Sequence, residues 1–134
     1  MAILKIEHLG IAVKNAADSK SVFEKLLGAE AYKEEAVESE GVKTIFYQLG
    51  ESKLELLEAT DPSSAISKYL DKNREGFHHL ALAVDDIYAE IKRLKKEGFI
   101  FINETPKKGA DNKLIAFIHP KSANGILLEL CQDM

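Results

Sequence analysis

The sequence predicts an α+β fold of two tandem βαβββ modules, because one pattern of residues occurs twice along the chain. The first copy begins at His8 and reads His-Leu-Gly-Ile-Ala-Val, and the second begins at His79 and reads His-Leu-Ala-Leu-Ala-Val. Each copy continues into an amphipathic stretch that ends at a glycine, and each closes with Leu-Glu-Leu around Glu55 or Glu129. The histidine and the glutamate are 47 positions apart in one copy and 50 in the other. We therefore expect pseudo-two-fold symmetry that brings four potential ligands together.

The first module is expected to contain one helix and four strands. Alternating apolar residues predict a strand at 3–13. Asp18 or Ser19 can cap the helix that follows, and Gly28 is suited to end it. Three further strands, separated by turn glycines, are expected at 29–38, 42–49 and 53–59.

The second module repeats this order after a connecting helix. Asp61-Pro62 is a suitable start for a helix at 63–72, because proline is tolerated in the first turn. A strand is expected at 77–84, and Asp85-Asp86 introduces the next helix. The remaining strands are expected at 99–103, 113–119 and 125–131, with loops at 106–112 and 119–125.

Length and composition favour a single domain. The chain has 134 residues, 46% of them hydrophobic, which is enough for one compact core. Each half alone would be near the lower limit for independent stability, so we expect the halves to share that core. The predicted domain covers 1–134, with module one at about 1–60, the connecting helix at about 61–73 and module two at about 76–134.

Strand alternation places the histidines beside small residues. Glycine or alanine stands two and four positions after His8 and after His79, on the same strand face, while the bulky residues face the helices. A packed core would fill such space, so mixed sheets curling around a central metal cavity are predicted. Glu55 and Glu129 also lie opposite their leucine neighbours, and a buried carboxylate is costly unless it is paired or bound to a cation. His78 falls on the helix-facing side and is interpreted as structural.

Charge and motifs exclude several classes of function. The net charge of −4 gives no general reason to expect nucleic acid or an anionic membrane as a partner. The single cysteine, Cys131, rules out an intrachain disulfide and a C-x-x-C motif. No signal peptide or apolar run of membrane-spanning length is recognised, so a cytoplasmic protein is expected. Phosphate-loop, dinucleotide-binding, nucleophile-elbow and H-E-x-x-H motifs are absent from the sequence.

The paired histidine and glutamate pattern resembles the vicinal oxygen chelate, or glyoxalase-like, superfamily. Over nearly the whole chain it is similar to the methylmalonyl-CoA epimerase branch of that superfamily. The doubled His78-His79, the Lys108-Gly109-Ala110 loop and the His119-Pro120-Lys121 turn point to this branch. Further matching segments are Lys53-Leu54-Glu55-Leu56-Leu57-Glu58, Val84-Asp85-Asp86-Ile87 and Gly125-Ile126-Leu127-Leu128-Glu129-Leu130.

The resemblance implies an isomerase that interconverts the C2 epimers of methylmalonyl-CoA, an acyl-CoA thioester, and acts as a homodimer. It implies a divalent metal ion, Co²⁺, with Mn²⁺, Zn²⁺, Ni²⁺ and Mg²⁺ as alternatives. The implied ligands are His8, His79 and Glu129, with Glu55 in the fourth position. The two glutamates are also the candidate groups for proton transfer.

The predicted site has two less defined parts. Some members of the family have a glutamate proposed as a base on the third strand, where this chain reads Lys43-Thr44-Ile45-Phe46. The identity of the base is therefore open. His119 and Lys121 are candidate substrate-binding residues, and a purely structural role of His119 in its turn is the alternative.

Three other functions fit the same residues. Two imidazoles and a carboxylate also suit an extradiol-type dioxygenase with non-haem iron, and a glyoxalase uses a similar ligand set. A metal-free protein that binds small molecules is a further alternative, although the presence of all four candidate ligands argues against it.

Overall fold

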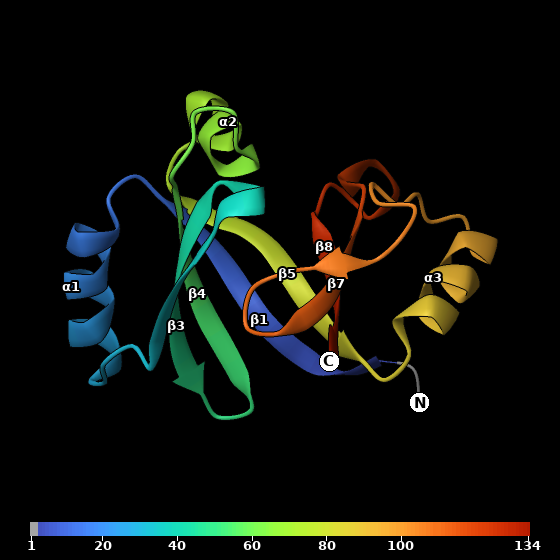
Figure 1. The fold of residues 1–134 in the computed structure, drawn as a ribbon, viewed down its shortest axis with the longest axis horizontal. Coiled ribbons are helices and arrows are strands. Elements are labelled where there is room, and N and C mark those ends of the chain that lie inside the picture. The colour runs from blue at the N-terminus through green and yellow to red at the C-terminus, as the bar shows by residue number, and fades with distance from the viewer. Residues whose placement is uncertain (1–2) are drawn as a thin grey trace. The chain divides into compact units, whose positions relative to one another are not determined.

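The computed structural model describes residues 3–134 and shows strands and helices in the predicted repeated order (Figure 1). The elements are β1 (Ile3–Val13), α1 (Ala16–Leu27), β2 (Lys33–Val37), β3 (Val42–Leu49), β4 (Ser52–Ala59), α2 (Ala65–Lys72), β5 (Gly76–Val84), α3 (Ile87–Lys96), β6 (Lys107–Lys108), β7 (Lys113–Ile118) and β8 (Leu128–Asp133). Short 3₁₀ helices occupy Glu38–Glu40 and Pro120–Ser122.

The described chain forms two compact units. The N-terminal unit is Leu9–His78, and the C-terminal unit joins His79–Met134 to the residues up to His8. The two units do not coincide with the two sequence modules, because the long strand β1 contributes its first part to the C-terminal unit and its last part to the N-terminal unit.

The strand order repeats from one module to the next. It is β2-β3-β4-β1 in the first and β6-β7-β8-β5 in the second, so equivalent strands hold equivalent places. Neighbouring strands β2, β3 and β4 pair antiparallel, as do β6, β7 and β8. Strand β5 pairs parallel to β8. The predicted α+β class with mixed strand pairing and two βαβββ modules is confirmed.

In the N-terminal unit, helices α1 and α2 both pack against β4. Leu54 and Leu56 of β4 belong to a cluster with Phe23 and Leu27 of α1. Val13 of β1 belongs to the same cluster, so the bulky face of this strand faces the helix as predicted. The exception is Leu9, which is 39% exposed.

In the C-terminal unit, helix α3 packs against β7 and β8. Its apolar residues form a cluster with the bulky faces of β5 and β8, as the alternation predicts; the members include Leu82, Val84, Ile87, Ile91, Leu94, Leu128 and Leu130. Glu90 of α3 is also buried, and Arg93 pairs with it at 2.8 Å.

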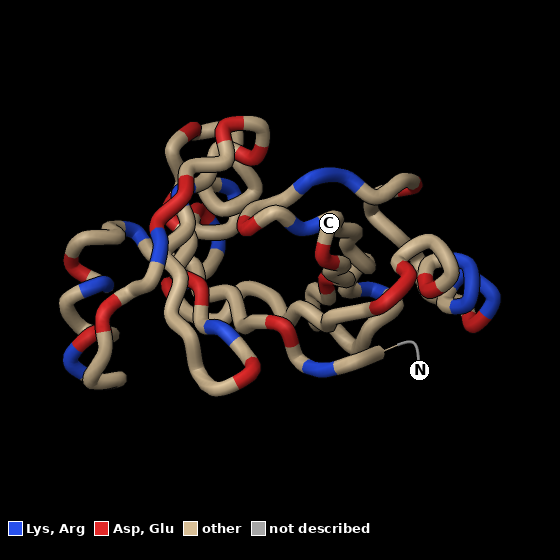
Figure 2. Tube along the Cα trace, turned by 60° about the horizontal axis from the view of Figure 1, so that its bottom comes forward, with Lys and Arg blue, Asp and Glu red and all other residues tan. Residues whose placement is uncertain are grey.

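Charged residues of both signs are spread through each unit, as Figure 2 shows along the Cα trace. In the N-terminal unit, Lys20 and Lys43 both contact the Glu34 carboxylate at the surface, at 2.8 and 3.2 Å. Hydrogen bonds from these lysines lower the pKa of Glu34. Among residues 3–134, no helix is both long enough and apolar enough to cross a bilayer.

Two helix starts differ from the prediction. Helix α1 is capped by Asn15, whose side chain accepts a hydrogen bond from the Asp18 amide at 3.0 Å, and not by Asp18 or Ser19. Helix α2 is capped by Ser64, while Asp61 accepts from the Ser63 amide in the preceding turn. In both cases several residues of the preferred capping types stand close together, so local composition does not select among them.

Three strand predictions are wrong in extent or place. The strand expected at 29–38 is only Lys33–Val37. The expected strand at 99–103 is reduced to a single bridge between Phe101 and Ile118, because the Asn103 side chain accepts the Phe117 amide at 2.9 Å and replaces a backbone partner. The strand expected at 125–131 begins only at Leu128.

The segment expected to be a loop at 106–112 contains β6. Its hairpin to β7 is closed by a bond from the Gly109 amide to the Lys113 carbonyl at 2.9 Å. Asp111 and Asn112 both have positive φ, 58° and 56°, which is the backbone conformation that tight hairpin turns require.

The capping assignment is testable by substitution. Asn15→Ala is expected to lower the free energy of unfolding by about 1 kcal/mol, because it removes the acceptor for a helix-terminal amide. Ser19→Ala is the matched control and is expected to change stability by less than about 0.5 kcal/mol. Urea denaturation followed by circular dichroism measures both. Equal losses for the two variants would contradict the assignment.

Candidate metal centre

Three of the four predicted ligands come together within the C-terminal unit. His8 lies on β1, His79 on β5 and Glu129 on β8. The Nε2 atoms of the two histidines are 2.9 Å apart. Oε1 of Glu129 is 2.9 Å from Nε2 of His79 and 3.2 Å from Nε2 of His8. The three donor atoms therefore converge on one point.

The spacing of these atoms fits a shared cation. Ligand atoms bound about 2.1 Å from one cation lie about 3.0 to 3.4 Å from one another. Two imidazole nitrogens and a carboxylate oxygen are also a ligand set that first-row divalent metals accept. Three protein ligands would leave further coordination positions of such a cation to substrate or water. The donor set could hold a catalytic divalent metal.

Burial and the neighbouring imidazoles act in opposite directions on the Glu129 carboxyl. His8 and His79 are each 4% exposed and Glu129 is 5% exposed. Burial by itself would raise the pKa of the Glu129 carboxyl, but in the metal-free protein hydrogen bonding to His79 and His8, together with their charge, outweighs burial and lowers it well below its ordinary value. Glu129 is therefore held as a carboxylate, the form that binds a cation.

Apolar residues and a thiol surround the cluster. The Phe117 ring meets the His79 ring edge-on, with centroids 5.8 Å apart. The Cys131 thiol donates to Oε2 of Glu129 at 3.4 Å, which leaves Oε1 directed to the histidines. Ala81 and Ile115 pack with Cys131 in a small buried cluster. These contacts keep the ligands in a low-dielectric setting and restrict their rotation.

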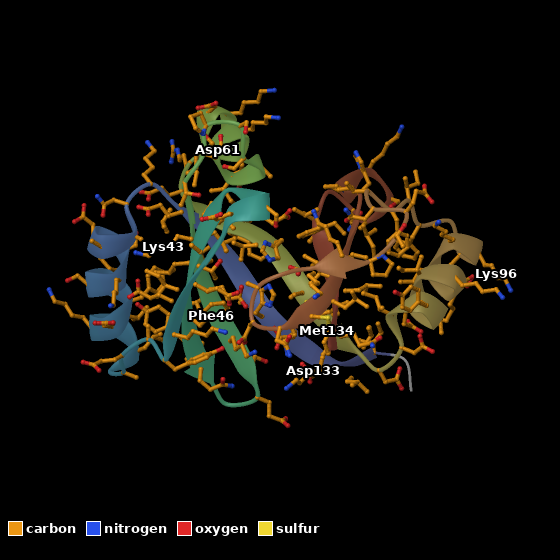
Figure 3. All side chains as sticks on the ribbon, viewed as in Figure 1. Lys43, Phe46, Asp61, Lys96, Asp133 and Met134 are labelled. Carbon is orange, nitrogen blue, oxygen red and sulfur yellow. The ribbon has the colours of Figure 1, made fainter. Side chains whose placement is uncertain are left out.

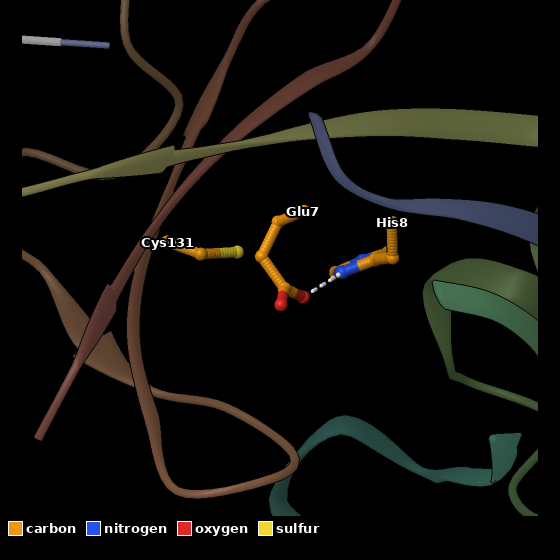
Figure 4. A group of neighbouring side chains, drawn as sticks. All are labelled: Glu7, His8 and Cys131. Atoms are coloured by element: carbon orange, nitrogen blue, oxygen red, sulfur yellow. Dashed lines mark hydrogen bonds and ion pairs between the residues drawn. The ribbon is translucent and has the colours of Figure 1, made fainter. Parts of the chain in front are cut away.

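Two charged residues beside the ligands were not predicted from the sequence. Glu7 is 3% exposed, and its Oε1 is 2.7 Å from Nδ1 of His8 (Figure 4). The Lys113 Nζ is 3.7 Å from the other oxygen of Glu7 and also pairs with Asp133, which Figure 3 places near the C-terminal end of β8. Strand alternation assigns Glu7 to the face opposite His8, so it gave no sign of this contact.

The fourth predicted ligand, Glu55, lies on β4 in the N-terminal unit. It is 5% exposed and stands opposite Phe46 of β3 in the strand register. Its neighbours Leu54 and Leu56 pack toward α1, so Glu55 is on the other face of the strand, as predicted. Thr44, one of the four residues in the β3 segment where some members of the family were expected to carry a base, is 1% exposed.

The other predicted residues lie in turns or against helices. His119 caps the 3₁₀ helix Pro120–Ser122, and its Nδ1 accepts the Lys121 amide at 3.0 Å. Both residues are exposed. A structural role for His119 is thus present, and substrate binding by His119 and Lys121 stays a prediction. His78 packs edge-on against Tyr69 of α2 at 4.9 Å, in agreement with its interpretation as helix-facing.

This fold and ligand pattern define a family. The profile of the Glyoxalase/Bleomycin resistance protein/Dioxygenase superfamily matches residues 7–117, and the chain belongs to this superfamily. Within it, several of the relatives that the chain resembles over almost its full length are enzymes that act on one kind of substrate.

Those relatives are methylmalonyl-CoA epimerases. The mitochondrial methylmalonyl-CoA epimerase of Dictyostelium discoideum is 39% identical, over 97% of this chain and 79% of that protein. The ethylmalonyl-CoA/methylmalonyl-CoA epimerase of Cereibacter sphaeroides is 37% identical, over 96% of this chain and 97% of that protein. The crystal structure of methylmalonyl-CoA epimerase from Mycobacterium tuberculosis has a TM-score of 0.94 at 32% identity, over 99% of this chain and 90% of that one.

A further solved structure contains the substrate of that enzyme. It is a methylmalonyl-CoA epimerase in complex with methylmalonyl-CoA and NH4+. Its TM-score is 0.92 at 30% identity, over 98% of this chain and 96% of that one.

The lowered pKa of Glu129 predicts how acid affects the metal-free protein. A carboxylate with a lowered pKa in the folded state stabilises the fold above the unfolded-state pKa of about 4.3, and this contribution is lost as pH falls through the folded-state pKa. The difference in unfolding free energy between wild type and Glu129→Gln should therefore shrink steadily from pH 5 to pH 2. Urea titrations across this range measure it, with exposed Glu104→Gln as control. A constant difference would contradict the role of this carboxylate.

Proposed function

We propose that the protein catalyses metal-dependent epimerisation of methylmalonyl-CoA at C2. The observation that carries the proposal is the convergence of His8, His79 and Glu129 on one buried point in a chain whose relatives are methylmalonyl-CoA epimerases. The reaction class suits such a site, because the C2 proton lies between a thioester carbonyl and a carboxylate and its removal produces an enolate.

The three ligands would hold a divalent cation in this proposal. When bound, the cation supplies a Lewis acid that stabilises negative charge on the thioester oxygen. Glu129 contributes its negative charge to the cation, and the Cys131 thiol and the histidines restrict the rotation of its carboxylate. Because the ligands are buried, they exclude water from one side of the site.

Proton transfer at C2 needs a group with an available lone pair. Glu129 is poorly suited, because its two oxygens are engaged by the histidines and Cys131 and its pKa is lowered. We propose Glu55, the second buried carboxylate among the predicted ligands, as the base. Its proposed place as a fourth ligand does not conflict with this, since a carboxylate has two oxygens.

The remaining parts of the proposal rest on the resemblance. By that resemblance Co²⁺ is the metal and the assembly is a homodimer; a cytoplasmic location is proposed separately. His119 and Lys121 contact the acyl-CoA thioester, which their exposure allows.

Hydrogen exchange at C2 tests the reaction class. A single epimer of methylmalonyl-CoA incubated with Co²⁺-loaded protein in heavy water is expected to gain deuterium at C2 and to convert to the other epimer. Proton NMR follows the gain of deuterium, and analysis of the epimers follows their interconversion. A chelator should abolish both, and added Co²⁺ should restore them.

Other outcomes separate the alternatives. Exchange that persists after complete metal removal would contradict metal dependence. Oxygen consumption without exchange would indicate a dioxygenase, and turnover of a glutathione hemithioacetal would indicate a glyoxalase.

The role of His79 as a ligand is tested by removing its imidazole. His79→Ala should lower the exchange rate by at least about 100-fold, by analogy with the loss of a residue that supports a metal ligand. The adjacent His78→Ala, which lies against Tyr69, is the matched control and should retain the wild-type rate.

The role of Glu55 is tested by an isosteric change. Glu55→Gln is expected to lower kcat by about 100- to 10,000-fold, because the amide cannot accept the C2 proton. Its metal content, measured by mass spectrometry of the loaded protein, should stay close to one ion per chain. Exposed Glu51→Gln on the preceding turn is the control. Epimerisation at the wild-type rate with metal retained would exclude Glu55 as the base.

A further inference from the structure

The side chain of Glu7 contacts the candidate ligand His8 from the side away from the other ligands. Oε1 of Glu7 lies 2.7 Å from Nδ1 of His8, whereas Nε2 of the same ring faces His79 and Glu129. Figure 4 shows Glu7 between Cys131 and the His8 ring, with its carboxylate turned toward the ring. The two nitrogens of His8 therefore have separate partners.

We infer that Glu7 is a positioning residue, which keeps a proton on Nδ1 of His8 and so presents the lone pair of Nε2 to a divalent cation. A carboxylate accepts a hydrogen bond from the ring N–H that faces it, and the other ring nitrogen is then the free donor to a metal. The bond also fixes the rotation of the ring. The inference rests on the metal centre of the proposed function.

The burial of Glu7 supports a dedicated role. A carboxylate that is 3% exposed is costly to bury unless charges and hydrogen bonds compensate it. His8 provides a hydrogen bond, and the Lys113 ammonium at 3.7 Å provides an opposite charge. Lys113 is itself mostly covered, with 13% of its side chain exposed. These two partners offset the cost of burying the Glu7 carboxylate, which indicates a defined role for this side chain and not a chance surface contact.

The repeat in the sequence makes Glu7 specific to one half. Glu7 precedes His8 in the first copy, whereas His78 precedes His79 in the second copy. His78 packs edge-on against Tyr69 of α2, and its imidazole is not the carboxylate that Glu7 supplies in the first copy. Glu7 therefore introduces an asymmetry between two ligands that the sequence repeat makes look equivalent.

Metal affinity tests the inference without using catalytic activity. Glu7→Leu is expected to weaken Co²⁺ binding by about 10- to 100-fold, the usual effect of losing the partner that orients a histidine ligand. Glu7→Gln should lose less Co²⁺ affinity, because its amide oxygen can still accept a hydrogen bond from Nδ1 of His8. Competition with a chelator, followed by the visible absorption of bound Co²⁺, measures the affinity. Glu104→Gln, which removes an exposed carboxylate paired with Lys95, is the matched control and should bind like wild type.

The outcomes separate this inference from the proposed function. Wild-type protein that binds no Co²⁺ overturns the metal centre and the inference with it. Wild type that binds Co²⁺ while folded Glu7→Leu binds it equally tightly overturns the inference alone. A second measurement needs no variant: long-range ¹H–¹⁵N NMR of the metal-free wild type should show a proton on Nδ1 of His8. An unprotonated Nδ1 would overturn the inference even if Glu7→Leu fails to fold.

Discussion

The contact of two imidazoles with one buried carboxylate is the constraint on which the rest of this structure depends. Burying Glu129 without compensation would favour its protonation, and the two histidines prevent this. Each partner comes from a different strand, so β1, β5 and β8 must keep their register for the three atoms to stay within 3.2 Å. The strand order and the packing of α3 against β8 help to maintain this register.

The same constraint explains the polar residues next to the ligands. A carboxylate at Nδ1 of His8 and a thiol at Oε2 of Glu129 occupy the atoms that do not face the centre. His8 and Glu129 thereby each direct one potential ligand atom to the same point. A cluster that is satisfied on its outer side and convergent on its inner side suits a cation more than a purely structural hydrogen-bond network.

The fold could be predicted from the sequence to a large extent, because its signals are local and repeated. The period-2 alternation placed Leu54, Leu56, Leu128 and Leu130 against the helices, and the structure confirms this. Errors arose where a single side chain decides the local structure. Asn15 caps helix α1, although Asp18 and Ser19 are also of the preferred capping types. The Asn103 side chain accepts the Phe117 amide, whose pairing with the backbone would have extended a strand.

By itself the sequence determined the module repeat and the candidate ligand residues, because both depend on spacing along the chain. Only the tertiary structure decided which of the four predicted ligands share one compact unit: His8, His79 and Glu129 converge there, and Glu55 lies in the other unit. It also decided that Glu7 forms a hydrogen bond with His8 and that Lys113, more than a hundred positions later, offsets the negative charge of Glu7. Strand alternation predicts the face of the strand on which a side chain lies. The residue that this side chain contacts depends on strands that come together from distant parts of the chain.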